Sequence, residues 1–365
     1  MDKSKRAFTK GSALASVSLM LGNARAESAA NVAVAAREPP YEASSRAQAF
    51  AKKMGIRYPI VQAVMGGATP DLAAAVAQAG GLGGMGLTWS SKAEVRDYVT
   101  RVRAATQGPF AVGYVLAFGA ATLEVALEAG APVIQFSFGT PSDGQVAQIR
   151  KAGAKFGMQI SNLAGARQAF DLGADYVSCQ GQEAGGHVQA QSSWHGHIAE
   201  ILAAAGQTPV LVAGGLGGGK DLRKVLAMGA SGGVFGTRFA ASKEYPAHPE
   251  YKHRLVKAKA GDTALTVCFD GGWTNVLHRV LRNPTLDKWE AAGAKPAGAR
   301  PGEGDVVGRN GDMTYERYHV WPPLAGTTGQ PADMALYAGL GVGEIRDIAS
   351  AGEIVRRIWT ECVHG

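Results

Sequence analysis

Cysteine and charged side chains are both scarce in this sequence. Its 365 residues include three cysteines, and only 18% of them are Asp, Glu, Lys or Arg. Cys179, Cys268 and Cys362 are odd in number and scattered, without the short spacing of metal ligands. The sequence therefore argues against a cysteine-ligated metal centre, while the cysteines say little about the compartment. Because Cys179 lies inside an apolar run, we expect it to be a packed core thiol.

A strongly basic surface is also missing. The formal net charge is +7, but residues 1–26 hold five basic residues and one acidic residue, which leaves +3 for the rest of the chain. No basic stripe with interleaved aromatic residues remains after that subtraction, and such a stripe is the usual sign of nucleic-acid binding. We therefore expect no nucleic-acid partner.

The N-terminal apolar run is too short to cross a bilayer. Residues 1–26 combine a basic start, a modest apolar run and small residues in an A-x-A arrangement, which predicts a secretory signal peptide. The piece SKRAFTKG resembles the twin-arginine export signal, with Lys5-Arg6 in place of the arginine pair. We therefore expect a periplasmic protein with no membrane partner. A disordered basic N-terminus on a cytoplasmic protein is the alternative.

Glycine, in contrast, is abundant. The chain has fifty glycines and 46% hydrophobic residues, so it can bury a core of one large domain or two ordinary ones. Since no Gly-X-Y period appears, the glycines indicate many tight loops or close approaches of backbone to a ligand.

After a polar linker predicted over 27–50, short apolar runs alternate with amphipathic stretches of helix length, such as those beginning at Asp71, Lys92 and Asp221. Strands that alternate with helices pair in parallel, and eight such units favour a closed (β/α)8 TIM barrel over an open doubly wound sheet. This α/β barrel is predicted over 51–245. The predicted strands lie near 58–65, 81–86, 110–115, 132–136, 156–160, 175–179, 209–213 and 232–235.

The alternation ends at about residue 245. Residues 246–340 are charged and contain proline and glycine, which predicts an added C-terminal lobe over the active site, and residues 341–365 are predicted as a helix that packs on the barrel. The lobe's aromatic residues could wall a pocket, although a small core of the lobe is the more common use. They are Trp273, Trp289, Tyr315, Tyr318 and Trp321.

Two glycine-bearing turns follow predicted strands seven and eight. Barrels of this type commonly hold a phosphate there, where backbone N–H groups and a helix N-terminus converge. Gly214, Gly215 and Gly236 would let main-chain amides approach an anion, and Thr237 would add a hydroxyl. Each turn alone has a simple alternative, an ordinary tight turn. Together they favour a phosphorylated cofactor.

The stretch QGQEAGGH begins at the end of predicted strand six, on the catalytic rim of such barrels. Gln180 can offer a donor and an acceptor to the edge of a heterocycle, and Gly185 brings backbone close to it. His187 would be the titratable group at the face of the ring, or a chemically idle loop histidine. We expect the carboxylate of Glu183 to hold the loop by accepting backbone N–H bonds. His195 and His197 form an H-x-H pair that lacks further ligands at recognisable spacing, so no metal site is expected.

Several segments resemble the FMN-dependent nitronate monooxygenases, formerly called 2-nitropropane dioxygenases, whose barrel is shared with FMN-containing enoyl-acyl-carrier-protein reductases. These segments are PIVQAVMGGATPDLAAAVAQAGGLGGMG, GADYVSCQGQEAGGH, PVLVAGGLGGGKDLRKVLAMGASGGVFGTRF and MALYAGLGVGEIRDI, in order over about 55–350. The resemblance implies that FMN contacts Ala63, Val64, Met65, Gln180 and Gly185, with its phosphate at Gly215, Val234, Phe235, Gly236 and Thr237. His187 matches the active-site histidine.

The resemblance implies oxidation of an alkyl nitronate, or a nitroalkane, by O₂ to a carbonyl compound and nitrite. His187 would orient and support the nitronate oxygens, or accept the α-proton of a nitroalkane. Two alternatives share the scaffold: an NAD(P)H-dependent FMN reductase of quinones or enoyl thioesters, and a catalytically silent FMN carrier. The sequence leaves open whether the chain forms a homodimer.

The sequence departs from this family at two positions. Many relatives carry proline where Val64 stands, and an asparagine that reaches the flavin where Gly113 stands. The resemblance therefore implies FMN binding but one hydrogen bond fewer near the flavin ring.

Overall fold

The computed structural model describes residues 44–365. The predicted signal peptide and the predicted linker as far as residue 43 lie outside the described residues. The linker prediction does not hold for residues 45–50, because helix α1 (Ser45–Met54) begins there and is capped by the Ser44 side chain. Phe50 of α1 is fully buried. The polar composition of this segment predicts a linker, but residues 45–50 form part of a helix with one buried face.

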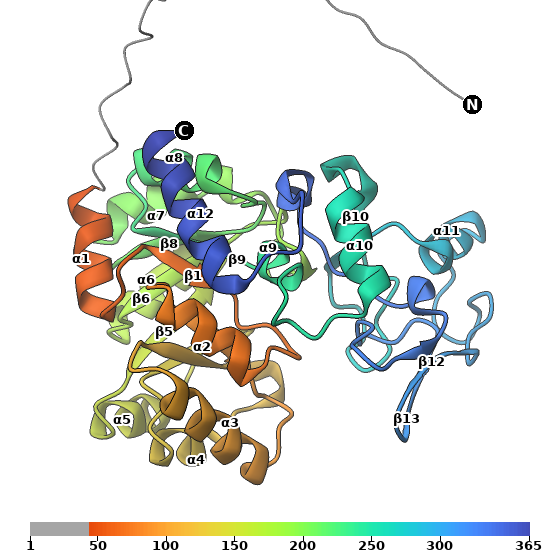
Figure 1. The fold of residues 1–365 in the computed structure, drawn as a ribbon, viewed down its shortest axis with the longest axis horizontal. Helices are drawn as coiled ribbons and strands as arrows, with labels where there is room; N and C mark the ends of the chain where they lie inside the picture. The colour runs from red at the N-terminus through yellow and green to blue at the C-terminus, as the bar shows by residue number, and fades with distance from the viewer. Residues whose placement is uncertain (1–43) are drawn as a thin grey trace, which may run out of the picture. The chain divides into compact units, whose positions relative to one another are not determined.

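Eight parallel strands form the barrel, in the order β1-β9-β8-β6-β5-β4-β3-β2. Figure 1 shows the barrel beside the lobe that follows it in the chain. The first and last strands of this order meet, because the Gln62 N–H donates to the Leu82 carbonyl over 2.9 Å and the Leu82 N–H donates to the Ile60 carbonyl over 2.9 Å. The predicted (β/α)8 barrel is thus confirmed, with a strand at each of the eight predicted places. The strands are β1 Ile60–Gln62, β2 Gly83–Gly86, β3 Phe110–Val115, β4 Val133–Ser137, β5 Lys155–Ile160, β6 Tyr176–Gln180, β8 Val210–Ala213 and β9 Gly232–Phe235.

Helices follow the strands and lie around the barrel. In α3 (Lys92–Ala105), Ser91 and Glu94 form a capping box, while Val95, Val99 and Val102 face the core at helical spacing. The other barrel helices are α2 Pro70–Gln78, α4 Leu123–Glu128, α5 Asp143–Lys151, α6 Leu163–Asp171, α7 Ile198–Ala204, α8 Gly219–Ala227 and α9 Thr237–Ala240, with 3-10 turns η1 Leu116–Phe118 and η2 Trp194–Gly196.

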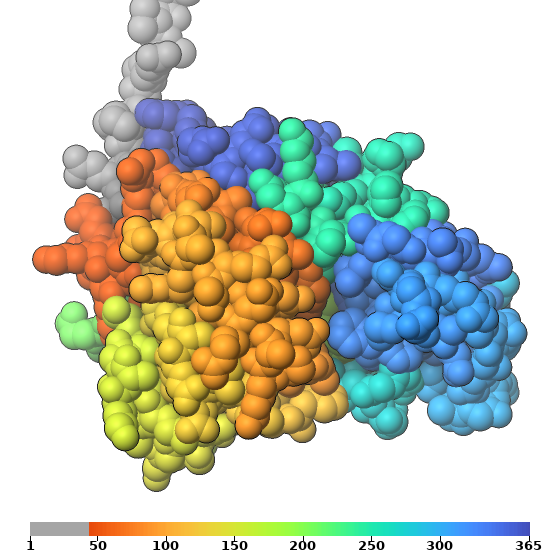
Figure 2. All heavy atoms as spheres, turned by 60° about the horizontal axis from the view of Figure 1, so that its bottom comes forward, coloured from red at the N-terminus to blue at the C-terminus, as the bar shows by residue number. Residues whose placement is uncertain are grey.

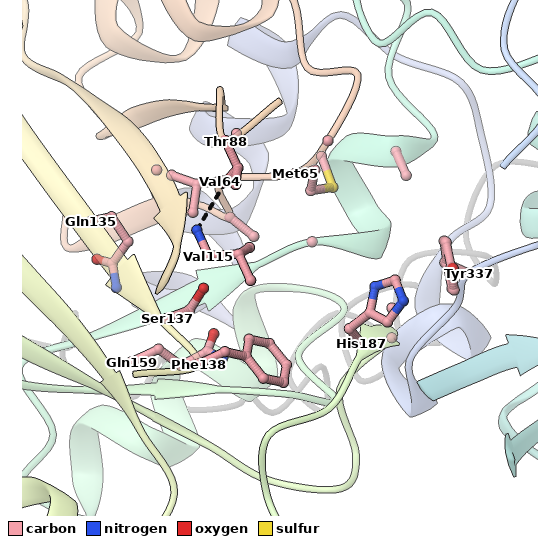
Figure 3. Close-up of a pocket in the computed structure, with 18 of the residues that line it drawn as sticks. Val64, Met65, Thr88, Val115, Gln135, Ser137, Phe138, Gln159, His187 and Tyr337 are labelled. Atoms are coloured by element: carbon pink, nitrogen blue, oxygen red, sulfur yellow. Dashed lines mark hydrogen bonds between the residues drawn. The ribbon is translucent and has the colours of Figure 1, made fainter. Parts of the chain in front are cut away.

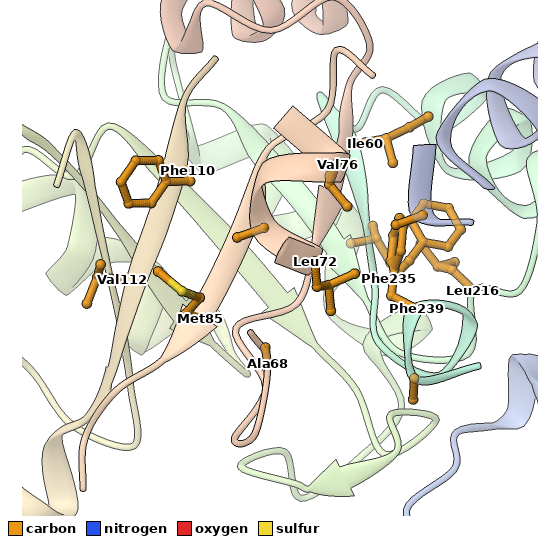
Figure 4. Close-up of a cluster of buried hydrophobic side chains, with 14 of the residues drawn as sticks. Ile60, Ala68, Leu72, Val76, Met85, Phe110, Val112, Leu216, Phe235 and Phe239 are labelled. Atoms are coloured by element: carbon orange, nitrogen blue, oxygen red, sulfur yellow. The ribbon is translucent and has the colours of Figure 1, made fainter. Parts of the chain in front are cut away.

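The main core lies between these helices and the strands. Ile60, Leu72, Val76 and Phe110 are fully buried there (Figure 4). Burying each such side chain contributes about 1.5–3 kcal/mol. A second cluster joins Phe50 of α1 to the first residues of several barrel strands, so α1 closes the N-terminal end of the barrel and leaves the C-terminal end for a site.

The lobe, residues 246–340, contains two small antiparallel sheets. One has the order β10-β11-β7 and the other β13-β12-β14, and buried ion pairs such as Arg317–Asp333 at 2.6 Å hold the lobe together. Strand β7 comes from the barrel rim, so the rim and the lobe share a sheet. The elements are β7 Gly186–His187, α10 Pro249–Lys257, η3 Ala260–Asp262, β10 Thr263–Thr266, β11 His278–Leu281, α11 Pro284–Ala291, β12 Val306–Asn310, β13 Met313–Glu316, β14 Thr328–Gly329 and η4 Pro331–Asp333.

The C-terminal helix is shorter than predicted. Residues 340–344 form the 3-10 turn η5 (Leu340–Glu344), and α12 (Ala351–His364) begins only after Ser350, whose side chain accepts the Glu353 N–H. Helix α12 packs against α2 and α8. A Cβ on Gly219 would lie 2.4 Å from the Ile358 carbonyl, so α8 and α12 approach closely there. None of the helices within residues 44–365 has the length and apolar character of a bilayer span.

Candidate functional site

A cavity of about 390 Å³ lies at the C-terminal ends of the barrel strands. Barrels of this fold carry their active sites at that end. The lobe supplies one wall, so the cavity lies between the strand ends and residues 272–337. Nine residues predicted as site residues line it: Ala63, Val64, Met65, Gln180, Gly185, His187, Val234, Gly236 and Thr237.

Three of the predicted cofactor contacts do not line the cavity. The Phe235 side chain is fully buried in the core, because successive side chains of a strand point to opposite faces and Val234 takes the inner one. Gly214 and Gly215 have φ of 112° and 77°, which favours glycine. Their turn packs against the loop before β7, where a Cβ on Gly214 would lie 2.9 Å from the Ala184 nitrogen.

His187 lies in β7 and is positioned by rings on three sides. Its ring centroid is 4.7 Å from that of Trp273, 5.3 Å from that of Tyr337 and 5.9 Å from that of His278. Figure 3 shows His187 beside Tyr337 at one side of the cavity, with Gln135 and Ser137 of β4 at the opposite side. The pairing of His187 with His278 across β7 and β11 fixes the histidine at this wall.

The imidazole of His187 is neutral and has a free ring nitrogen. Burial, and to a smaller extent the neighbouring His278, lower its pKa from 6.5 to about 3. Three buried side-chain atoms lack a hydrogen-bond partner within residues 44–365, and among them Nε2 of His187 is the one on a cavity-lining residue. A buried nitrogen without a partner is costly unless a ligand satisfies it, so this atom marks a binding position.

His278 is neutral as well, but it is fully occupied. Its Nδ1 donates to the Val276 carbonyl over 3.0 Å, and its Nε2 accepts the Phe269 N–H over 3.1 Å. The ring is fully buried, and burial lowers its pKa to about 4. His278 therefore positions β11 and packs beside His187 rather than facing a ligand.

Three tyrosines that line the cavity donate to main-chain carbonyls. The Tyr245 hydroxyl donates to the Gly66 carbonyl over 2.9 Å, Tyr251 donates to the Tyr337 carbonyl, and Tyr337 donates to the Val320 carbonyl. Burial raises the pKa of all three phenols. They remain protonated. The Tyr245 bond lies within the barrel, and the bonds of Tyr251 and Tyr337 lie within the lobe.

Gln180 supports the histidine loop. Its Nε2 donates to the His187 carbonyl over 3.3 Å, and its Oε1 accepts the Gln189 N–H over 2.7 Å. We expected this amide to read the edge of a heterocycle. Both of its functional groups bond the loop that carries His187, so Gln180 positions that loop. Each group keeps one further bonding position at the cavity, so the contact with a heterocycle stays a prediction.

Val64 fills the space above two barrel glycines. A Cβ on Gly113 would lie 2.6 Å from Cγ2 of Val64, and a Cβ on Gly84 would lie 2.7 Å from its Cγ1. Such distances are shorter than any stable contact between carbon atoms. The lack of the asparagine that the resemblance implies at position 113 therefore has a local cause, because Val64 excludes a side chain there.

The cavity has an open helix N-terminus at the predicted phosphate position. Within the described chain no side chain caps α9, whose first residue is Thr237. A Cβ on Gly236 would meet only Ala63 at 3.7 Å, so the backbone there is accessible. The Thr237 hydroxyl accepts the Gly339 N–H over 3.0 Å and keeps its own proton to donate. Uncapped N–H groups and a hydroxyl that still has its proton to donate suit a phosphate.

The Glu183 carboxylate does not hold the loop as expected. Its Oε2 is buried without a partner, and its Oε1 lies 3.6 Å from Nδ1 of His195. The Glu183 main-chain carbonyl accepts the Leu340 N–H over 3.0 Å instead. Residues 44–365 contain no group of three or more His, Cys, Asp and Glu side chains that could hold a metal ion.

The lobe aromatics divide between the two predicted uses. Trp273 and Trp321 line the cavity, whereas Trp289, Tyr315 and Tyr318 pack in the lobe's own clusters. The predicted site residues do not include the aromatic residues that follow strands β2, β3 and β4. Their places within three residues of a predicted strand end are the signal that could have identified them. These residues are Trp89, Phe118 and Phe138.

Comparisons with known proteins place the chain in one family. The family model described as nitronate monooxygenase matches residues 47–122 and 117–361. Nitronate monooxygenase of Pseudomonas aeruginosa is 32% identical over 360 residues, covering 86% of this chain and 98% of the relative. A (3aS,4S,5R,7aS)-5-hydroxy-7a-methyl-1-oxo-octahydro-1H-indene-4-carboxyl-CoA dehydrogenase of Mycobacterium tuberculosis is 32% identical, over 65% of this chain and 67% of that protein.

Solved structures agree with this placement. FabK from Thermotoga maritima superimposes with a TM-score of 0.73 at 28% identity, covering 85% of this chain and 94% of FabK. Nitroalkane oxidase from Streptomyces ansochromogenes superimposes with a TM-score of 0.67 at 29% identity, covering 86% and 97% of the two chains.

Proposed function

This chain belongs to the nitronate monooxygenase family of oxidoreductases, and we propose that it is an FMN-dependent enzyme that oxidises alkyl nitronates with O₂ to a carbonyl compound and nitrite. The observation that carries this proposal is the free, buried Nε2 of His187 at the wall of the barrel-end cavity. The uncapped N-terminus of α9 at the same cavity supports a phosphorylated cofactor.

The residues of the cavity fit FMN. The backbone N–H groups at Gly236 and Thr237 and the Thr237 hydroxyl would hold the phosphate, and the main chain from Ala63 to Met65 would lie along the ring. Bound FMN supplies a ring that accepts electrons from the substrate. The protein binds and orients both partners and excludes water from the apolar cavity.

His187 is proposed to hold the reacting group. A neutral imidazole presents one N–H donor, so Nε2–H can donate to an oxygen of the nitronate. If a neutral nitroalkane binds instead, the same nitrogen in the other tautomer can accept the α-proton. The negative charge that then develops on the substrate raises the pKa of the imidazole, because opposite charges at contact favour the protonated form.

Nitrite release tests this function directly. Purified protein loaded with FMN is mixed with propyl-1-nitronate in air, and nitrite and propanal are measured. We expect both products in equal amounts, with O₂ consumed. Absence of nitrite from fully loaded enzyme would contradict the proposal.

The relation to FabK and to the M. tuberculosis CoA dehydrogenase favours testing a second function. In this alternative the enzyme is an NAD(P)H-dependent FMN reductase of quinones or enoyl thioesters. Such an enzyme would oxidise NAD(P)H in the presence of a quinone and release no nitrite from a nitronate. The two assays on one preparation therefore separate the two functions.

A further inference from the structure

A continuous series of aromatic rings leads from His187 to the surface. The centroids of His187 and Trp273 lie 4.7 Å apart, those of Trp273 and Phe118 5.0 Å, those of Phe118 and Trp89 5.3 Å, and those of Trp89 and Trp321 5.9 Å. We call these five residues the aromatic arc. Trp89 is 50% exposed and Phe118 42% exposed, so the arc ends in solvent.

The arc joins the barrel to the lobe. Trp89 and Phe118 follow strands β2 and β3, whereas Trp273 and Trp321 belong to the lobe. The lobe segment drawn in blue lies directly beside the barrel segment drawn in orange (Figure 2). A ligand that enters along this seam therefore meets aromatic faces and edges from both sides.

The cavity wall has no formally charged side chain. None of the lining residues in the described chain is Lys, Arg, Asp or Glu. Three lobe arginines have partners outside the cavity: Arg279 donates to the Gln182 carbonyl over 2.9 Å, Arg300 lies 2.7 Å from Asp270, and Arg317 lies 2.6 Å from Asp333. Since no Lys or Arg among residues 44–365 lines the cavity, a substrate carboxylate would find no such cation at its wall.

We propose that this cavity selects substrates whose body, beyond the group that reacts at His187, is uncharged and apolar, with planar rings favoured and a carboxylate rejected. A carboxylate that enters would lose its hydration without gaining a cation. An apolar body would instead gain from burial, and a ring would gain further from edge and face contacts with the arc. This selectivity rests on the proposed function, which places a single anionic head at His187.

Binding of a matched pair of ligands tests the selectivity without turnover. FMN-loaded protein is titrated with nitrobenzene and with 4-nitrobenzoate in a calorimeter at pH 8. The two ligands share a ring and a nitro group and differ in one carboxylate. We expect the dissociation constant of 4-nitrobenzoate to be at least about 100-fold higher. Equal dissociation constants would overturn the proposal.

A cation placed on the arc should weaken the selectivity. Phe118 is suited to this change because it is exposed and lies in the short turn η1. Phe118→Lys is expected to bind 4-nitrobenzoate at least about tenfold more tightly than Phe118→Gln does, since only the lysine can pair with the carboxylate. If the lysine variant binds 4-nitrobenzoate no more tightly than the glutamine variant does, the lack of a cation is not what rejects a carboxylate, and the proposal is wrong.

A matched pair of nitronates connects selection to the reaction. We expect kcat/KM to be at least about 100-fold higher for propyl-1-nitronate than for propionate 3-nitronate, which carries a carboxylate. If neither is oxidised while nitrobenzene still binds selectively, the proposed function fails and the selectivity stands. If both are oxidised with equal kcat/KM and both nitro compounds bind equally, the function stands and the selectivity fails.

Discussion

The His187 imidazole is buried among other rings, and one of its nitrogens still has no hydrogen-bond partner among residues 44–365. Its ring is packed between Trp273 and Tyr337 and is kept neutral, yet Nε2 remains without a partner at a cavity wall. The sequence indicated the rim position, because glycines and a histidine follow strand β6. It could not indicate the three ring neighbours, since Trp273, His278 and Tyr337 lie about 90 to 150 residues further along the chain.

Replacing His187 tests its role at the substrate. His187→Asn should leave the protein yellow with bound FMN and lower kcat/KM for propyl-1-nitronate by about 100-fold or more, because the oriented ring nitrogen is lost. His253→Asn, an exposed histidine on α10, is the matched control and should keep wild-type kinetics. Unchanged turnover in His187→Asn would show that the assigned role is wrong.

His278 should make the fold sensitive to acid. Its pKa of about 4 in the fold is below the ordinary value of 6.5, so below pH 6.5 the unfolded chain binds a proton that the folded chain does not. The contribution of neutral His278 to the free energy of unfolding is therefore complete above pH 6.5 and is lost as the pH falls towards 4. Between pH 7.5 and 5.0 this group alone should cost about 2 kcal/mol of unfolding free energy.

Urea unfolding of wild type and His278→Gln at the two pH values checks this. Glutamine can keep a donor and an acceptor at this position but does not titrate, so the variant should lose about 2 kcal/mol less than wild type does on acidification. The same loss in both proteins would contradict a neutral, buried His278.

At the scale of elements, the contact between the β1 rim turn and strand β3 couples two positions. Val64 occupies the space that a side chain at Gly113 would need. Gly113→Asn should therefore lower the unfolding free energy by about 1–3 kcal/mol and weaken FMN binding. Adding Val64→Ala to this variant should restore much of the lost unfolding free energy and of the lost FMN affinity. Urea unfolding and FMN titration of the two single variants and the double variant measure the coupling, and strictly additive effects would contradict it.

The barrel elements were predictable because their signals are local. Each barrel strand is a short apolar run before a glycine-bearing turn, and α3 matches its predicted pattern from Lys92 to Ala105. Strand β7 has no such signal. It contains two residues and exists because β11, about 90 residues later, pairs with it. The predicted C-terminal helix begins too early, because Ile345 and Ile348 continue the helical spacing although 345–349 lie outside any helix.

For the whole molecule, the sequence located half of the cavity. The barrel half follows from repeated strands and turns, and nine predicted site residues line the cavity. The lobe half has irregular sequence, and its wall residues are brought together by ion pairs and by the shared sheet β10-β11-β7. These contacts join residues that are distant in sequence, so no local pattern shows which lobe aromatics face the cavity.

The cellular compartment of the protein is also a property of the whole chain. The predicted signal peptide over 1–26 lies outside the described residues. We propose that the protein is exported by the twin-arginine route after it has folded. Full-length protein expressed in a bacterium with that pathway should appear in the periplasmic fraction. Replacing Lys5-Arg6 by two glutamines should retain it in the cytoplasm. Equal distribution of the two forms would contradict export by this signal.

The central claim is that the barrel-end cavity holds FMN and passes substrate electrons to it, with His187 at the reacting group. Anaerobic mixing of FMN-loaded protein with propyl-1-nitronate, followed by absorbance, tests this most directly. We expect loss of the oxidised flavin band in wild type at a rate at least about 100-fold above that of His187→Asn. A flavin that stays oxidised with the nitronate but is bleached by NAD(P)H would contradict the claim.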